Sequence, residues 1–210
     1  MQTFADPLLR AAQTAGHRTA VISEGRQYSH NELRSRCCRL AGALKRLGAE
    51  PGDRIAILAA NTNHYIEAYL AIPAAGFVIV PLNTRHAEPE LRYAIEDAGA
   101  KILISDRDPG SLRDLVHAVM MIPEEYEAML ESADESELGI GVTEDALAGL
   151  FYTGGTTGAS KGVMLTHRNL ISNSLHFMTV APPSPSDVFL VMAPLFHAAG
   201  SNGVLGGVWS

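Results

Sequence analysis

The chain has 210 residues, enough for one large domain or two small ones with a substantial core. Apolar residues make up 47% of it and charged residues 19%, which is the balance of a soluble globular protein. The formal net charge of −7 provides no basic stripe for a nucleic acid, and we exclude nucleic acids as partners. A lysine and backbone N–H groups can still form a local site for a small anion such as a nucleotide.

The sequence predicts neither a transmembrane segment nor a secretory signal. No run approaches the roughly 18 apolar residues of a transmembrane segment, and residues 1–7 lack the basic and apolar regions of a secretory signal. Cys37 and Cys38 are the only cysteines. Adjacent cysteines rarely form an unstrained disulfide, and two thiols are too few for a metal site. We expect reduced thiols in a cytoplasmic protein.

Strand-like and helix-like segments alternate through the first hundred residues. Thr19–Ser23 and 26–28 are short strand candidates on either side of a turn. Ser29 and Glu32 have the spacing of a capping box, which predicts the start of a helix. Gly48 has the position that commonly ends one.

The next segments predict a parallel sheet. The compact apolar runs 54–60, 77–81 and 101–105 have the pattern of buried strands, and helices are expected between them at 63–75 and Glu88–Ala98. Continuous apolar strands that alternate with helices indicate a parallel sheet covered on both faces. The predicted fold class is therefore α/β, with mostly parallel sheet layers flanked by helices.

The pattern weakens over residues 106–145. Within this stretch, residues 123–145 carry nine carboxylates and no lysine or arginine. Such a segment is either an acidic interaction surface or a solvated helix and loop between core elements. We favour the second interpretation, because charge runs usually form solvated faces.

A loop rich in glycine and threonine at residues 153–161 is the sharpest feature of the sequence. It follows the apolar segment 146–152, and a helix is expected to begin near Thr166. Four glycines and three threonines within residues 153–162 suit neither a helix nor a packed strand. Glycines let successive backbone N–H groups surround an anion, and threonine hydroxyls donate to phosphate oxygens or join a magnesium shell. With the positive charge of Lys161, the loop predicts a phosphate-binding site.

Two common nucleotide motifs do not fit this loop. In the Walker motif a lysine follows a glycine directly and precedes a serine or threonine. Here Ala159 and Ser160 separate Gly158 from Lys161, and Gly162 occupies the Ser/Thr position. No three glycines have the spacing of the dinucleotide motif either. A surface turn that is rich in glycine and threonine is the remaining alternative.

Residues 152–170, YTGGTTGASKGVMLTHRNL, resemble the phosphate-binding signature of the adenylate-forming superfamily. That family comprises acyl- and aryl-CoA synthetases, luciferases and peptide-synthetase adenylation domains. Further similar segments lie at 28–32, 52–58, 81–83 and 194–200. The resemblance thus extends over nearly the whole chain except residues 106–145.

The resemblance implies a reaction in two steps. A carboxylate attacks the α-phosphate of Mg-ATP to give an acyl-adenylate and pyrophosphate, and a thiol, usually CoA, then displaces AMP. The implied ligands are therefore ATP, Mg²⁺, CoA and a small carboxylic acid. Phosphate contact is expected from Thr153, Gly154, Gly155, Thr156, Thr157, Gly158 and Lys161. Thr153 would lie nearest to magnesium, and Lys161 would stabilise the leaving phosphate.

His197 is the second catalytic candidate beside Lys161. It matches a family position at the acyl pocket, where an aromatic or histidine side chain orients the carboxylate or gates the tunnel. A hydrogen-bonded core histidine beside Phe196 is an equal alternative. His167 and Arg168 are expected to cap and pack the helix after the loop rather than touch substrate.

Two positions depart from the commonest family pattern. Gly154 stands where many members have serine, and Ser160 where many have proline. The glycine form resembles that of fatty-acyl-CoA ligases, which favours a fatty acid as the substrate. The absence of the proline is expected to loosen the loop without removing a phosphate ligand.

The resemblance also implies that residues 1–210 are an incomplete N-terminal AMP-binding domain. Residues 1–150 would form a first α/β subdomain, and 151–210 the phosphate-binding loop and the start of a second. Family members continue with segments that bind adenine and ribose and with a C-terminal domain, so we expect the chain alone to be inactive. A non-catalytic nucleotide-binding module and an adenylation domain that loads a carrier protein are the alternatives. The oligomeric state, a homo-oligomer included, is left open by the sequence.

Overall fold

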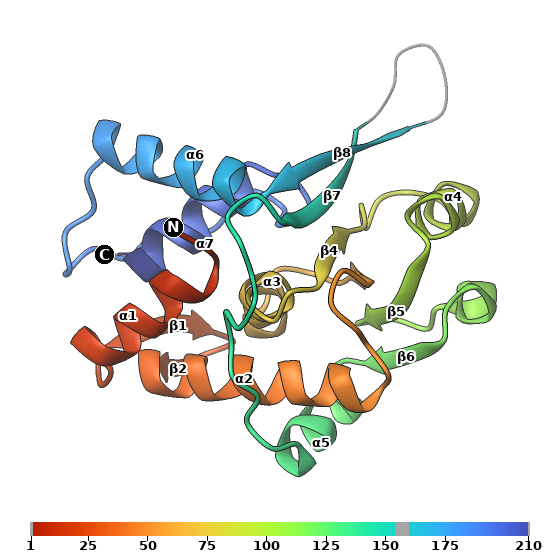
Figure 1. Ribbon diagram of the computed structural model, residues 1–210, viewed down its shortest axis with the longest axis horizontal. Helices are drawn as coiled ribbons and strands as arrows, with labels where there is room; N and C mark the ends of the chain where they lie inside the picture. The colour runs from red at the N-terminus through yellow and green to blue at the C-terminus, as the bar shows by residue number, and fades with distance from the viewer. Residues whose placement is uncertain (1, 154–159, 210) are drawn as a thin grey trace.

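A computed structural model describes residues 2–153 and 160–209, which form a two-stranded and a six-stranded sheet (Figure 1). The small sheet pairs β1 (Thr19–Ser23) with β2 (Arg26–Ser29). The strands of the large sheet are β3 (Arg54–Leu58), β4 (Val78–Pro81), β5 (Ala100–Ser105), β6 (Ala118–Met121), β7 (Leu147–Thr153) and β8 (Lys161–Thr166). The helices are α1 (Ala5–Ala15), α2 (His30–Arg46), α3 (Asn63–Ala74), α4 (Glu88–Ala98), the 3-10 helix η1 (Gly110–Leu115), α5 (Glu124–Ser132), α6 (His167–Val180) and α7 (Gly200–Trp209).

The large sheet has the strand order β6-β5-β3-β4-β7-β8 and is mostly parallel. β3 pairs in parallel with β4 and β5, β5 with β6, and β4 with β7, whereas β7 and β8 pair antiparallel. The chain passes from β3 to β4 and then to β5 on the other side of β3, so the connections after β3 and β4 leave in opposite directions. Ligands of open α/β sheets bind at such a switch point, outside the carboxyl ends of the strands.

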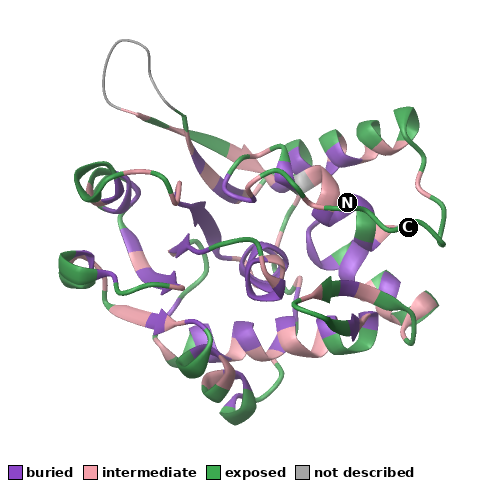
Figure 2. Cartoon of the chain, turned by 180° about the vertical axis from the view of Figure 1, so that it is seen from behind, coloured by how far each residue is buried: buried purple, intermediate pink, exposed green. Residues whose placement is uncertain are grey.

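Helices cover both faces of this sheet, which confirms the predicted α/β class. Ile55 and Ile57 belong to a core shared with α2 and α3, whereas Ala56 and Leu58 belong to a second core shared with α4 and η1. α3 is buried along nearly its whole length, as its purple ribbon in Figure 2 shows. The continuous apolar runs of the sequence therefore correspond to strands buried on both sides.

The predicted capping box is present at the start of α2. The backbone N–H of Ser29 donates to Oε2 of Glu32 at 2.8 Å, and the N–H of Glu32 donates to Oγ of Ser29 at 3.2 Å. Gly48 follows the helix with φ of 86°, a left-handed conformation that favours glycine. The sequence interpretation missed α1 and α7. The latter contains four glycines and is stabilised by packing against α1 and α6 rather than by helix propensity.

The acidic segment forms α5 and a following loop that fold onto the basic face of α2. Glu127 pairs with Arg36 at 2.6 Å, and Glu135 pairs with Arg34 at 3.2 Å. The segment is therefore a helix and loop between core elements, as predicted, but Glu127 and Glu135 are paired with arginines of α2 rather than simply solvated. The domain division expected after residue 150 falls within β7, which pairs with both β4 and β8.

Cys37 and Cys38 are both buried and form no disulfide. Burial raises the pKa of each thiol, so both are expected to be unreactive. Within the described part of the chain, none of the helices is both long and apolar enough to cross a bilayer.

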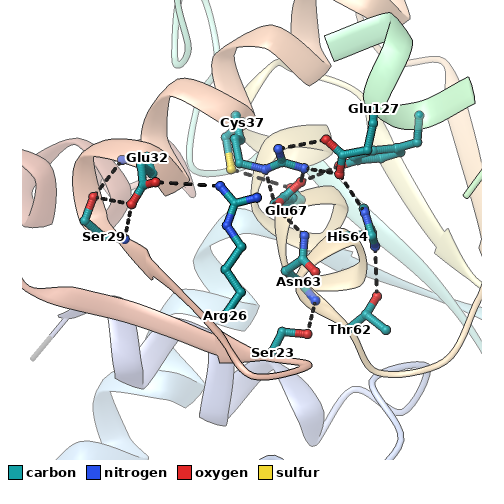
Figure 3. A network of polar contacts seen from close by, with 12 residues as sticks. Ser23, Arg26, Ser29, Glu32, Cys37, Thr62, Asn63, His64, Glu67 and Glu127 are labelled. Carbon is teal, nitrogen blue, oxygen red and sulfur yellow. Dashed lines mark hydrogen bonds and ion pairs between the residues drawn. The ribbon is translucent and has the colours of Figure 1, made fainter. Parts of the chain in front are cut away.

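A network of charges around the buried Glu67 ties α2, α3 and α5 together (Figure 3). The carboxylate of Glu67 on α3 is fully buried and accepts from Nε of Arg36 at 2.7 Å, from Nδ2 of Asn63 at 2.9 Å and from the hydroxyl of Tyr126 at 2.9 Å. Arg36 also pairs with Glu127, whose second partner is Nε2 of His64 at 2.8 Å. Partial burial would raise the pKa of Glu127, but the bonds from Arg36 and His64 lower it.

We predict that Arg36→Met lowers the free energy of unfolding by about 3–5 kcal/mol, because it leaves the buried carboxylate of Glu67 without its cation. Urea denaturation measures this change. The matched control is Arg34→Met, which removes a half-exposed ion pair on the same helix and should cost less than about 1 kcal/mol. Equal small losses for the two variants would contradict a stabilising role for the network.

Candidate functional site

A cavity of about 280 Å³ lies at the carboxyl ends of β4 and β7. Its lining combines apolar and polar side chains: Pro81, Leu82, Asn83, His86, Leu91, Ala94, Tyr152, Thr153, Phe196 and His197. Two residues predicted from the sequence, Thr153 and His197, are thereby brought to one cavity although 44 positions separate them in the chain.

The β7–β8 hairpin places Lys161 beside Thr153. The two residues are Cα partners at the end of the antiparallel pair, and Oγ of Ser160 donates to the backbone oxygen of Thr153 at 2.5 Å. Directly opposite side chains on antiparallel strands share a face and lie about 5 Å apart at Cβ. A hydroxyl and an ammonium group are thus presented together, both on exposed residues. Gly154, Gly155, Thr156, Thr157 and Gly158 lie outside the described residues.

Tyr152 fastens the loop end of this hairpin to α4. Its hydroxyl donates to Oδ2 of Asp97 at 2.7 Å, and its ring meets that of Tyr93 edge-on at a centroid distance of 6.4 Å. Burial and the Asp97 carboxylate raise the pKa of Tyr152, so the phenol stays protonated and can donate. A Cβ at Gly162 would approach the Tyr152 ring to 3.2 Å, so a larger residue there would crowd this ring. The sequence interpretation gave Tyr152 no role.

His197 is exposed and lines the cavity, whereas the adjacent Phe196 is buried. The two rings lie 4.4 Å apart between centroids. This placement rules out the alternative of a core histidine. The assignment of His197 to the acid substrate stays a prediction.

Asn83 and His86 are lining residues that the sequence interpretation missed. Both follow β4 directly in the loop to α4, where Oδ1 of Asn83 accepts from the N–H of Arg85 at 3.0 Å and the backbone oxygen of Asn83 accepts from the N–H of His86 at 3.0 Å. Their position just after a buried parallel strand is the signal that could have identified them.

His167 and Arg168 pack the start of α6 away from the cavity lining, as predicted, but the prediction that they cap this helix is wrong. His167 is buried, and its Nδ1 accepts from the backbone N–H of Phe4 at 3.2 Å. Burial lowers the pKa of His167 to about 4, so the ring is neutral near pH 7. Arg168 pairs with Glu144 at 2.7 Å, and the cap itself is supplied by Thr166.

Comparison with known proteins identifies the family of the chain that forms this cavity and hairpin. The family model described as AMP-binding enzyme matches residues 8–210. The chain belongs to the AMP-binding enzyme family. The adenylate-forming resemblance of the sequence is thereby confirmed, over a stretch that includes Thr153, Lys161 and His197.

Several CoA ligases are similar to this AMP-binding chain. It is 38% identical to a feruloyl-CoA synthase from Amycolatopsis sp and 35% identical to a long-chain-fatty-acid–CoA ligase from Thermus thermophilus. Each match covers 91% of the chain but 39% of the relative, so the chain spans well under half the length of these proteins. Among solved structures, o-succinylbenzoate CoA synthetase from Bacillus subtilis in complex with its acyl-adenylate intermediate aligns with a TM-score of 0.86. It is 29% identical, over 99% of this chain and 54% of the other.

We predict that Tyr152→Phe lowers the free energy of unfolding by about 1 kcal/mol, because Asp97 loses its hydrogen-bond donor. Urea denaturation measures the loss. Tyr93→Phe is the control. Within the described part of the chain, Tyr93 contacts Tyr152 through its ring, which phenylalanine retains. If both substitutions cost the same, the hydroxyl bond is not what fastens the hairpin.

Proposed function

We propose that the chain is the incomplete N-terminal AMP-binding domain of an acid–thiol ligase. This ligase would use ATP to convert a carboxylic acid to an acyl-adenylate and then to a thioester of CoA. Residues 1–150 would form its first subdomain and 151–210 the start of its second. The observation that carries the proposal is the hairpin, which presents Thr153 and Lys161 together beside a cavity lined by His197.

The hairpin end suits the phosphates of ATP. Mg-ATP, when bound, supplies an activated α-phosphate and a pyrophosphate leaving group. Lys161 would stabilise the charge that develops on the leaving phosphates, and the cross-strand register would hold it in position. No ion pair with a described carboxylate competes for its ammonium group. Gly154, Gly155, Thr156, Thr157 and Gly158 would contribute the remaining phosphate contacts.

The side chains near the hairpin also fit a magnesium ion that is coordinated mainly by phosphate oxygens. The described residues contain no group of three or more His, Cys, Asp or Glu side chains that could hold a metal ion. Mg²⁺ retains several waters and commonly binds through substrate phosphates with few protein ligands. We assign the hydroxyl of Thr153 as the protein ligand within these residues.

The cavity fits an acid with an apolar body. Leu82, Leu91 and Phe196 provide an apolar wall, and His86 and His197 provide polar groups that can orient a carboxylate. The resemblance at Gly154 favours a fatty acid. An aryl acid is the second candidate, because the feruloyl-CoA synthase is the more similar of the two relatives.

The acceptor and the compartment complete the proposal. CoA is the proposed thiol, and a carrier protein is the alternative acceptor. A cytoplasmic location is supported by the two buried thiols, which form no disulfide.

Exchange of labelled pyrophosphate into ATP tests the proposal. We would compare the full-length enzyme that contains this chain with the 210-residue chain alone, across a panel of fatty and aryl acids. The longer protein is expected to exchange only when a suitable acid is present, and the chain alone is expected to be inactive. ATP binding without exchange for any acid would contradict a ligase and support a non-catalytic nucleotide-binding module.

We predict that Lys161→Ala slows adenylate formation by about 10²–10³-fold, since one charge-stabilising contact to the leaving phosphates is lost. The exchange rate in the full-length enzyme measures this effect. Lys45→Ala, which removes a distant exposed cation from α2, should leave the rate unchanged. An unaltered rate in Lys161→Ala would remove Lys161 from the site.

A further inference from the structure

The carboxamide of Asn61 joins the end of β3 to a distant segment of the chain. Its Nδ2 donates to the backbone oxygen of Ala193 at 2.9 Å and to that of Val191 at 3.4 Å. Its Oδ1 accepts from the backbone N–H of Leu195 at 2.9 Å. One side chain thus holds three backbone groups more than 125 positions away, and none of the roles assigned above uses it.

The hydrogen bonds from Asn61 hold a backbone segment that lacks the regular hydrogen bonds of a helix or a strand. Residues 191–195 lie in neither a helix nor a strand, so their N–H and C=O groups are not paired in a ladder. Backbone polar groups that leave water must find partners elsewhere. The N–H of the buried Leu195 finds its partner in Asn61, whereas Ala193 is exposed. Together with the bonds to Val191 and Ala193, this contact fixes the path of the segment.

The path of the segment decides where the next two residues lie. Leu195 is buried and is followed by Phe196 and His197, which line the 280 Å³ cavity. Phe196 also lines a smaller neighbouring cavity of about 180 Å³, which Asn61 itself borders. The carboxamide is therefore linked to the cavity wall through a short stretch of backbone.

The turn that carries Asn61 is itself anchored to the sheet. The N–H of Ala60 donates to Oδ2 of Asp106 at 2.6 Å, and the N–H of Asp106 donates to the backbone oxygen of Leu58 at 3.1 Å. The carboxyl ends of β3 and β5 thus hold this turn in place. A side chain on an anchored turn can position its partners, because its own backbone does not move with them.

The bonding pattern requires an amide. Asn61 must donate to two carbonyl oxygens and accept from one N–H group, and a carboxylate offers acceptors alone. A reversed amide would set oxygen against oxygen at Ala193 and nitrogen against nitrogen at Leu195, so the network fixes the orientation.

We propose that Asn61 is a positioning residue that holds Phe196 and His197 in the cavity wall, so that they orient the carboxylic acid substrate. The role toward the acid rests on the proposed ligase function. The role in holding residues 191–195 does not, and it can be tested on the chain alone.

Amide hydrogen exchange of the 210-residue chain, followed by NMR, tests the positioning. In Asn61→Ala the amide of Leu195 should exchange about 5- to 10-fold faster, because its acceptor is lost. In Asn61→Ser, whose shorter side chain cannot reach all three groups, the Leu195 amide should exchange faster by a similar factor. This variant replaces the alanine variant if the latter folds poorly. The control is Asn173→Ala, which removes an exposed amide bonded to Asn202. Unchanged exchange at Leu195 in a folded Asn61 variant would overturn the proposal.

Steady-state kinetics of the full-length enzyme test the link to the substrate. The Asn61 variants should raise KM for the acid roughly tenfold while KM for ATP changes less than about twofold, since the hairpin is untouched. Equal changes in both constants, or none, would overturn the role toward the acid. If the unmodified enzyme shows no acid-dependent exchange, the ligase function fails, and the Leu195 result still decides whether Asn61 positions the segment.

Discussion

The parallel pairing of β4 with β7 is the constraint on which the candidate site depends. The two strands meet at Ile79 and Gly149, where a Cβ on the glycine would lie 3.2 Å from Cγ2 of Ile79 and 2.7 Å from the Phe151 ring. This close approach favours glycine, because a side chain at position 149 would crowd Ile79 and the Phe151 ring. It aligns the carboxyl end of β7 with those of β3 and β4, so that the hairpin residue Thr153 and the loop residue Asn83 reach one cavity.

The charge network around the buried Glu67 holds the start of α3, close in the chain to the cavity residue Asn61. Asn63, at the start of α3, donates through Nδ2 to Glu67 and through its backbone N–H to Oγ of Ser23 at 3.1 Å. The first turn of α3 is thus tied to the network and to β1. Asn61 lies two residues earlier in the chain. The network around Glu67 contains none of the proposed substrate ligands. Through Asn63 it nevertheless helps to place Asn61, which borders the smaller cavity.

Much of the fold could be predicted from the sequence because the signals for it are local. The apolar strands, the capping box of Ser29 and Glu32 and the glycine-rich loop each depend on residues close together in the sequence. α7 could not be predicted in this way, because its glycines disfavour a helix and its stability comes from contacts with α1 and α6. Asn61 and His86 were missed for a related reason. The role of a polar residue after a strand becomes visible only when the fold brings another segment into contact with it. For Asn61 that segment begins at Val191, 130 positions away.

The central claim is that the loop end of the β7–β8 hairpin, at Thr153 and Lys161, holds the phosphates next to the cavity. NMR titration of the ¹⁵N-labelled chain with magnesium pyrophosphate tests it most directly. The account predicts chemical-shift changes at Thr153, Ser160 and Lys161, with none at the remote residues Glu127 and Leu130 of α5. Shifts confined to other surfaces, or no shift at the hairpin at saturating pyrophosphate, would contradict it.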